Sequence, residues 1–330
     1  MYLAIKELHE QEDYSISWMC KKLGISRAAY YKWLNRPIPA KELEDIELAE
    51  KIREYHEHYG GILGYRRMTI FLNRLEGKNY KPKRVRRIMG IIGIHSSIRR
   101  IRKGCTVSNK KDPKADNVLK RDFEASAPNE KWTTDVTEFK VPGEKKKLYL
   151  SAFMDLYDRS IVAWAVSSRN DNALVLETFQ QAIAVYPDAH PLFHSDRGFQ
   201  YTSPAFRHTL SEHAMTQSMS RVACCIDNGP QEAFWGIIKT EMPKLFEYHE
   251  RASLIEAVDK YINFYNNERY QERFDSKTPM EVRTEALQAD TPIIYPIPIN
   301  RRIQNYKQYL AELNASKSPT ESAPIGQALL

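Results

Sequence analysis

The chain has 330 residues, 42% of them hydrophobic, which is enough for two or three small domains and at least one buried core. It contains no apolar run near the roughly 18 residues of a membrane-spanning helix, no signal-peptide pattern, and no zinc-ligand or disulfide-framework spacing among its 4 cysteines. These features predict a reducing, cytoplasmic setting without a membrane partner, and the formal charge of +7 favours a polyanionic partner.

The positive charge is concentrated in one part of the chain. Residues 60–121 contain 18 lysines and arginines against 3 acidic residues, so this part carries 18 − 3 = +15 and the rest carries 7 − 15 = −8. Its arginines are interleaved with apolar residues at helical spacing, as in YRRMTIFLNRL and KRVRRIMGIIGI. This pattern favours a nucleic-acid-binding surface over a merely solvated basic one.

The first segment, residues 1–60, is predicted to be helical. Within it, residues 14–36 predict two short helices around a tight turn at Gly24, with Ser26 as the cap of the second helix. Two interpretations stay open, a helix-turn-helix whose second helix enters the major groove of DNA and an ordinary helical hairpin. Residues 41–58 predict a charged helix that completes the segment.

A second basic pair of helices is predicted within residues 61–104. Pro82 stands near the start of the later helix, where a missing backbone N–H is tolerated. Basic side chains on this pair are candidates for contacts with DNA phosphates or bases. The candidates are Arg66, Arg67, Lys81, Lys83, Arg84, Arg86 and Arg87. Residues 105–127 lack periodicity and are predicted to be a linker.

Residues 128–285 are predicted to contain strands and helices in a fixed order. Three strands come first, in KWTTDVTEFKV, LYLSAFMDLYD and SIVAWAVSS, and the helix NALVLETFQQAIAVY follows. The strand PLFHSD, the helix SPAFRHTLSEHA, the strand TQSMSR and the helix PQEAFWGIIKTEM come next. This order predicts an α/β domain with a mixed sheet and helices on its faces. A further helix, HERASLIEAVDKYINFYNN, extends the domain, and residues 286–330 predict a partly disordered tail.

Three acidic residues stand where the local pattern favours other residue types. Asp135 lies inside the first strand, Asp196 ends the fourth, and Glu232 lies in the first turn of a helix. If the first and fourth strands are neighbours, the two aspartates lie side by side, and a helix crossing that end of the sheet brings the glutamate to them. Each residue also has an ordinary alternative role. These are an ion pair with the GEKKK turn for Asp135, a turn or cap for Asp196, and a favourable helix N-terminus for Glu232.

Three carboxylates at one point repel one another and are costly to bury unless a cation neutralises them. Hard oxygen ligands suit Mg²⁺ or Mn²⁺, and a pair of such ions can activate a nucleophile and stabilise a leaving oxygen in phosphoryl transfer. Asp135, Asp196 and Glu232 are therefore predicted to be the catalytic and metal-binding residues of a site for Mg²⁺ (or Mn²⁺).

The segments WTTDVTEF, HSDRGFQY and DNGPQEAFWGIIKTE resemble the three catalytic blocks of insertion-sequence transposases of the IS-three family, relatives of the retroviral integrases. That family has an Asp, Asp, Glu triad with thirty-five residues between the last two, and 35 residues separate Asp196 from Glu232 here. The resemblance covers about residues 10–285. Gly229, Trp235 and Arg197 depart from the family's usual residues, and none of these changes removes a carboxylate.

This resemblance implies a ribonuclease-H-like catalytic core behind N-terminal helix-turn-helix DNA-binding segments and ahead of a helical extension. It implies a DNA transposase that cleaves strands at the ends of an insertion sequence and transfers them to a target, with two Mg²⁺ ions held by the triad. The implied partners are both kinds of DNA, further copies of this chain in a homo-oligomer, and the product of an upstream reading frame. The implied location is the cytoplasm of a bacterium, in association with the nucleoid.

The resemblance also points to residues around the triad. Lys239, seven residues after Glu232, matches a basic position near the DNA, and Gln200 and Tyr201 match a block that shapes the site, contacts DNA or serves packing. Asn228 is expected to cap the catalytic helix or orient Glu232.

Two other functions remain as alternatives. A nuclease of the same fold would act on an RNA–DNA hybrid or a junction, but the basic helical region and the thirty-five-residue spacing argue against it. A non-catalytic DNA-binding regulator would use the helix-turn-helix segments, and it predicts that substitutions of the three carboxylates leave every activity intact.

Overall fold

The computed structural model describes residues 1–98, 117–141, 143–221 and 225–297, and single positions between 301 and 312. Most of the predicted linker and most of the predicted tail lie outside these residues. Within the described part of the chain, no helix has both the length and the apolar character needed to cross a membrane.

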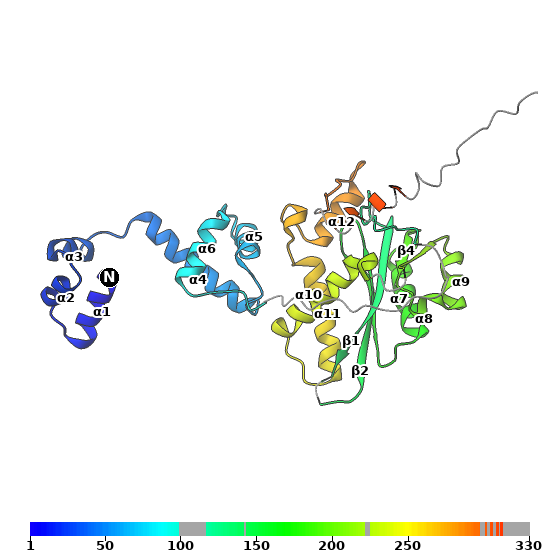
Figure 1. The fold of residues 1–330 in the computed structure, drawn as a ribbon, viewed down its shortest axis with the longest axis horizontal. Coiled ribbons are helices and arrows are strands. Elements are labelled where there is room, and N and C mark those ends of the chain that lie inside the picture. The colour runs from blue at the N-terminus through cyan, green and yellow to red at the C-terminus, as the bar shows by residue number, and fades with distance from the viewer. Residues whose placement is uncertain are drawn as a thin grey trace, which may run out of the picture.

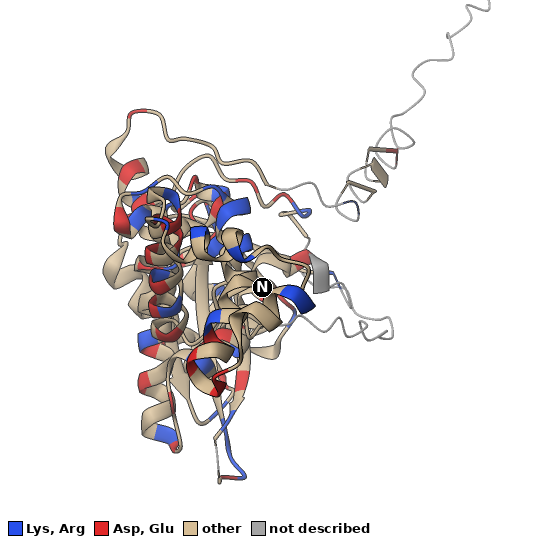
Figure 2. Cartoon of the chain, turned by 90° about the vertical axis from the view of Figure 1, so that its left-hand side faces the viewer, with Lys and Arg blue, Asp and Glu red and all other residues tan. Residues whose placement is uncertain are grey.

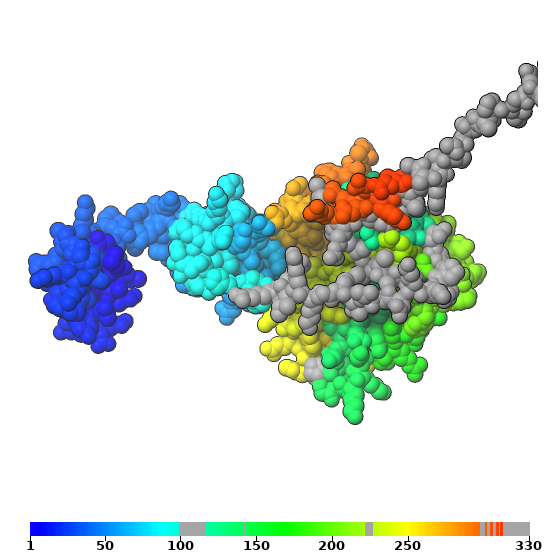
Figure 3. Space-filling view, viewed as in Figure 1, coloured from blue at the N-terminus to red at the C-terminus, as the bar shows by residue number. Residues whose placement is uncertain are grey.

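Three short helices at the N-terminus form a unit with a small core of its own. They are α1 (Tyr2–Glu12), α2 (Ile16–Lys22) and α3 (Arg27–Leu34). Gly24 makes the turn between α2 and α3 with a φ of +65°, and the Ser26 hydroxyl caps α3 by accepting a hydrogen bond from the Ala29 N–H at 3.0 Å. The core consists of Ile5, Met19, Cys20 and Tyr30. Figures 1 and 3 show this unit standing apart from the others.

A second helical unit packs directly on the rest of the molecule (Figure 1). Its helices are α4 (Ala40–His58), α5 (Tyr65–Glu76) and α6 (Pro82–Ile91). The sequence pattern grouped the charged helix with the preceding helices. In the structure, the buried residues of α4 are Leu48, Ile52 and Tyr55, and they belong to the core that α5 and α6 share. Because these residues lie from the middle of α4 onward, the C-terminal part of α4 joins the second unit.

The described strands form one five-stranded mixed sheet, as the sequence predicted. The strands are β1 (Lys131–Lys140), β2 (Lys147–Asp155), β3 (Ile161–Ser167), β4 (Leu192–Ser195) and β5 (Thr216–Met219). Their spatial order is β3-β2-β1-β4-β5. The first three strands pair antiparallel, and β4 and β5 are parallel to β1. Strand β1 is therefore central and has β4 as its direct neighbour.

Helices cover both faces of the sheet (Figure 1). On one face lie α7 (Asn172–Val185), α8 (Phe199–Thr202) and α9 (Pro204–Glu212), and on the other α10 (Gly229–Leu245) and α11 (Arg251–Asn267). Strand β2 serves both cores, because Phe153 packs with the first face while its neighbours Ala152 and Met154 pack with the second. The second core is continuous with that of α4, α5 and α6. The helical unit and the sheet domain therefore share one hydrophobic core.

The C-terminal extension is anchored by a buried ion pair. Helix α12 (Pro279–Gln288), which follows the short helix η2 (Glu272–Phe274), carries Arg283. Its guanidinium donates hydrogen bonds to Asp155 and Asp158, both at 2.9 Å. Leu119 and Phe123, from the segment predicted as a linker, pack in the same cluster as Phe274. The described end of that segment therefore packs into the hydrophobic core of the domain.

Candidate active site

The pairing of β1 with β4 brings the first two candidate carboxylates together. The parallel register sets Thr133 opposite His194. Asp135 lies two residues beyond Thr133 on β1, and Asp196, two residues beyond His194, directly follows β4. The charge of Asp196 raises the pKa of Asp135, so the two carboxylates lie close together. The side-by-side arrangement expected from the sequence therefore follows from the strand order.

A tight turn holds Asp196 at the end of its strand. One oxygen of its carboxylate accepts a hydrogen bond from the Gly198 N–H at 2.8 Å. A Cβ atom at residue 198 would stand 2.9 Å from that oxygen and 2.8 Å from the side-chain oxygen of Gln200. A side chain at this position would therefore displace the Asp196 carboxylate or the Gln200 side chain.

The surroundings raise the pKa of all three acidic side chains. Burial, followed by the charge of Asp196 and to a smaller extent that of Glu232, raises the pKa of Asp135 to about 7. Burial also raises the pKa of Asp196, and partial desolvation by the protein surface raises that of the more exposed Glu232. A nearby cation would relieve all three effects at once, because it stabilises the charged form of each carboxylate.

Glu232 reaches the site from the first turn of α10. Pro230 near the start of this helix and the acid in its first turn both favour a helix N-terminus. Asn228 does not cap the helix with its side chain. Instead its side-chain amide oxygen accepts a hydrogen bond from the Thr133 hydroxyl at 2.7 Å, and its side-chain NH₂ group donates to the Thr134 carbonyl at 2.9 Å. Asn228 therefore attaches the start of α10 to β1.

The donor set fits a hard divalent cation, although the side chains are not arranged as a closed metal site. Asp135 and Asp196 offer carboxylate oxygens side by side, and Glu232 is the exposed third carboxylate on the neighbouring helix. Among the described residues, no three histidine, cysteine, aspartate or glutamate side chains lie close enough together to hold a metal ion.

Gln200 and Tyr201 lie beneath the site and not on its surface. Both side chains are buried. The Tyr201 hydroxyl shares a hydrogen bond with the Thr134 hydroxyl at 3.0 Å, and the Gln200 amide donates to Asn170. Of the roles left open by the sequence, packing and support of the site agree with this burial, whereas direct contact with DNA does not.

Two side chains of α10 extend the site beyond the triad. Lys239 is exposed and lies 5.7 Å from the centre of the Phe139 ring. Partial burial lowers the pKa of Lys239, and the nearby charges of Glu138 and Asp135 oppose that shift. The Trp235 indole N–H donates a hydrogen bond to Asp135 at 3.0 Å. The sequence analysis gave Trp235 no role, although its position three residues after Glu232 on one helix was a usable signal.

The basic side chains of α5 and α6 that were predicted to contact DNA, together with Lys81, fall into two groups. Arg67 turns inward and binds the buried Glu241 at 2.8 Å. Arg84 binds Asp45 at 2.8 Å, and Arg87 binds the same carboxylate. Figure 2 accordingly shows basic and acidic residues interleaved along the helices on this side of the molecule. Acidic partners therefore neutralise part of the charge that the sequence assigned to DNA.

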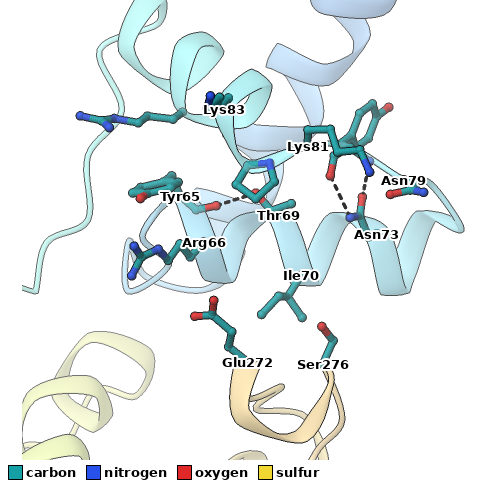
Figure 4. A pocket seen from close by; sticks show the side chains of 13 residues that line it. Tyr65, Arg66, Thr69, Ile70, Asn73, Asn79, Lys81, Lys83, Glu272 and Ser276 are labelled. Atoms are coloured by element: carbon teal, nitrogen blue, oxygen red, sulfur yellow. Dashed lines mark hydrogen bonds between the residues drawn. The ribbon is translucent and has the colours of Figure 1, made fainter. Parts of the chain in front are cut away.

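The second group lines a pocket of about 820 Å³ between α5, α6 and the η2 region (Figure 4). It consists of Arg66, Lys81, Lys83 and Arg86. The guanidinium groups of Arg66 and Arg86 lie 5.6 and 5.5 Å from the centre of the Tyr65 ring. Glu272 and Ser276 of the C-terminal extension lie opposite α5 across the pocket. Basic and aromatic groups in one concave surface are typical of nucleic-acid contacts.

A buried ionic network connects this helical unit to the catalytic helix. Glu241 of α10 accepts hydrogen bonds from Arg67 of α5, from Arg269 after α11 at 2.9 and 3.0 Å, and from the Tyr261 hydroxyl at 2.9 Å. Burial alone would raise the pKa of Glu241, but Arg269 and Arg67 outweigh it and lower the pKa to about 2. The sequence analysis did not identify Glu241, because no local pattern distinguishes it from a solvated glutamate.

Comparisons with known proteins agree with this architecture. Family models described as "Integrase core domain" match residues 125–225 and 232–287, and one described as "HTH-like domain" matches residues 42–102. InsK of insertion sequence element IS150 from Escherichia coli (strain K12) is 35% identical over 283 residues, which are 85% of this chain and 98% of that protein. The transposase for insertion sequence element IS904 from Lactococcus lactis is 33% identical over 253 residues, 74% of this chain and 96% of its own.

A solved structure of the HTLV-2 integrase catalytic core domain in complex with magnesium is similar to 47% of this chain and 95% of its own, with 22% identity and a TM-score of 0.37. The sheet topology and the family matches together define a protein with an integrase core domain and an HTH-like domain. The chain belongs to the family of insertion-sequence transposases.

Proposed function

We propose that the protein cleaves DNA strands at the ends of an insertion sequence and transfers them to a target, at a site formed by Asp135, Asp196 and Glu232. The observation that carries this proposal is the position of the two aspartates on neighbouring strands, Asp135 within β1 and Asp196 directly after β4, with a raised pKa for each. Uncompensated carboxylates in one place are the arrangement that a divalent-metal phosphoryl-transfer site requires.

The chain's own groups have separate tasks in this reaction. Asp135 and Asp196 offer fixed carboxylate oxygens, and Glu232 adds a third from the helix that Asn228 attaches to β1. Two Mg²⁺ (or Mn²⁺) ions held there would activate the attacking hydroxyl group and stabilise the departing 3′-oxygen. Lys239 stands two turns beyond Glu232 on α10 and offers a positive charge to a DNA phosphate. No serine or tyrosine of the chain is needed as a nucleophile.

The assay uses the purified full chain with labelled DNA that carries the ends of the element. We expect nicking and joining in Mg²⁺ or Mn²⁺, and neither after addition of EDTA, while binding of the DNA persists. Glu232→Gln is run in parallel and is expected to bind DNA without processing it. A non-catalytic regulator would bind DNA equally in all of these conditions, and a ribonuclease-H-like nuclease would cut hybrids or junctions without joining any ends.

The proposed partners follow from the same reaction. Two DNA ends must be paired before transfer, so we infer a complex that contains more than one copy of this chain. The product of an upstream reading frame is a further proposed component. If the chain binds DNA but processes none in any metal, adding that product tests whether a missing partner is the cause. Association with the bacterial nucleoid is proposed because both substrates are DNA.

We further propose that the pocket between α5 and α6 contacts the DNA backbone. Lys83→Ala is expected to weaken DNA binding similarly for all sequences and to lower the slope of log affinity against log salt by about one, because one phosphate contact is lost. Fluorescence anisotropy over a series of salt concentrations measures this slope.

Arg53→Ala is the matched control for that measurement. Arg53 is exposed on α4 and does not line the pocket. Its removal lowers the total positive charge by the same amount and should leave the slope close to the wild-type value. Equal slopes for the Lys83 variant and the wild type would remove the pocket from the DNA interface.

A further inference from the structure

The catalytic helix is attached to the central strand at two points, one on each side of Glu232. Asn228 makes the first attachment through Thr133 and Thr134. Trp235 makes the second, because its indole N–H donates a hydrogen bond to the Asp135 carboxylate at 3.0 Å. Trp235 is 7% exposed and packs beside Phe234, with ring centres 5.2 Å apart. The indole is therefore held in place by the core and not by the carboxylate alone.

The Asp135 carboxylate receives one hydrogen bond on each oxygen. One oxygen accepts from the Val136 N–H at 2.8 Å, and the other accepts from Trp235. A carboxylate oxygen has two acceptor positions, so this arrangement leaves one position on each oxygen open to a cation. Without the indole, only the donor from Val136 opposes rotation of the carboxylate, and the terminal torsion of aspartate is intrinsically broad.

Trp235 and Glu232 lie three residues apart on α10 and so share one side of the helix. The hydrogen bond from Trp235 consequently fixes two things, the plane of the Asp135 carboxylate and the separation between β1 and the helix that carries Glu232. Groups that orient metal ligands in this way commonly contribute 10–100-fold to metal affinity or activity.

We propose that Trp235 is a positioning residue of the metal site, whose indole N–H orients Asp135 and sets the distance between the first and third carboxylates. This inference rests on the proposed function, since it requires that these carboxylates bind a divalent cation. Trp235 itself touches neither the cation nor the DNA.

The test is the variant Trp235→Phe, which keeps an aromatic ring in the core but removes the N–H. Mn²⁺ binding to the full chain without DNA is measured by isothermal titration calorimetry, and cleavage is measured against Mg²⁺ concentration. We expect the dissociation constant for Mn²⁺ to rise about 10-fold or more. The Mg²⁺ concentration for half-maximal cleavage should rise with it, while DNA affinity stays unchanged.

Trp164→Phe is the matched control. The Trp164 indole also donates to an aspartate, Asp259, at 2.7 Å, but this pair lies between β3 and α11 and outside the site. The control variant should bind Mn²⁺ as the wild type does. Equal Mn²⁺ affinities for Trp235→Phe and the wild type would overturn the proposal.

Asp135→Asn separates failure of this inference from failure of the proposed function. If the wild type binds Mn²⁺ and Asp135→Asn does not, Asp135 is a metal ligand. The Trp235→Phe result then tests only whether Trp235 positions that ligand. If Asp135→Asn binds Mn²⁺ as the wild type does, Asp135 is not a metal ligand, and both the proposed metal site and the role of Trp235 are rejected.

A second measurement, by NMR, observes the Trp235 indole in the wild type and therefore does not depend on whether a variant at residue 235 folds. The chain has 5 tryptophans, so the ¹⁵N-labelled indole signals of the wild type can be assigned by replacing the other four one at a time. Titration with Mg²⁺ is expected to shift the Trp235 signal and to leave that of Trp164 in place. A stationary Trp235 signal under conditions where Mg²⁺ binds would contradict the proposal.

Discussion

Replacing Asp196 with asparagine is expected to reduce DNA cleavage and joining about 10³-fold or more, since divalent metals supply several kcal/mol of transition-state stabilisation and each ~1.4 kcal/mol is tenfold in rate. The substitution removes one charge and one hard ligand without changing the size of the side chain. Asparagine can still accept the hydrogen bond from the Gly198 N–H, so the turn after β4 should persist. Single-turnover cleavage of labelled DNA ends in Mg²⁺ measures the loss.

The same variant should be at least as stable as the wild type. Burial raises the pKa of Asp196, which means that the folded protein disfavours its charged form. Asparagine removes that cost, so the thermal midpoint in metal-free buffer should stay the same or rise. Asp259→Asn, in the pair with Trp164 between β3 and α11 and outside the site, is the control and should change neither activity nor DNA binding. Cleavage by the Asp196 variant within tenfold of the wild-type rate would contradict the assignment.

Replacing Glu241 with alanine is expected to destabilise the protein by about 3–5 kcal/mol, the usual result of removing one partner from a buried ionic group. The carboxylate is 3% exposed and is shared by Arg67 and Arg269. Its loss leaves both guanidinium groups without their common partner, in a core that joins the helical unit, α10 and α11. Urea unfolding at neutral pH, followed by circular dichroism, measures the shift in midpoint.

Glu144→Ala provides the comparison for this measurement. Glu144 pairs with Arg251 at 2.7 Å, a distance similar to that of the Arg67 pair, but both side chains are about a third exposed. Solvent screens such pairs, so the midpoint should barely move. Equal shifts for the Glu241 and Glu144 variants would show that burial of the network contributes nothing to stability.

The Glu241 network also predicts a dependence of stability on pH. The folded pKa of about 2 lies below the ordinary value of 4.5, so the unfolded chain binds this proton more readily. The contribution is fully present above pH 4.5 and declines as the pH falls toward 2. Wild type and Glu241→Ala should therefore converge in stability across that window, and a constant difference between them would oppose this account.

The order of elements in the catalytic domain followed from local sequence patterns. Alternating and continuous apolar runs marked the strands, and helical spacing marked the helices that separate them. The side-by-side placement of Asp135 and Asp196 was predictable once β1 and β4 were assumed to be neighbours. That assumption was the uncertain step, because strand pairing depends on residues far apart in the chain, and the structure confirmed it.

The limits of the sequence appear most clearly at Arg66 and Arg67. They are adjacent in a basic segment, and nothing local separates their roles. In the structure, Arg66 lines the pocket, whereas Arg67 binds Glu241, which lies 174 residues away along the chain. Successive residues of a helix point in different directions, so the packing of α5 against α10 decides which of the two faces solvent.

The amino-acid sequence by itself determined the family and the order of strands and helices, and it singled out the three candidate acidic residues, because each of these depends on residue types at fixed spacing. Only the tertiary structure decided which basic side chains remain available to DNA, which indole reaches Asp135, and that Gly60 must be a glycine. A Cβ at that position would lie 2.0 Å from the Lys244 carbonyl oxygen of α10. These properties arise where elements distant in sequence pack together, and the local sequence pattern does not predict such contacts.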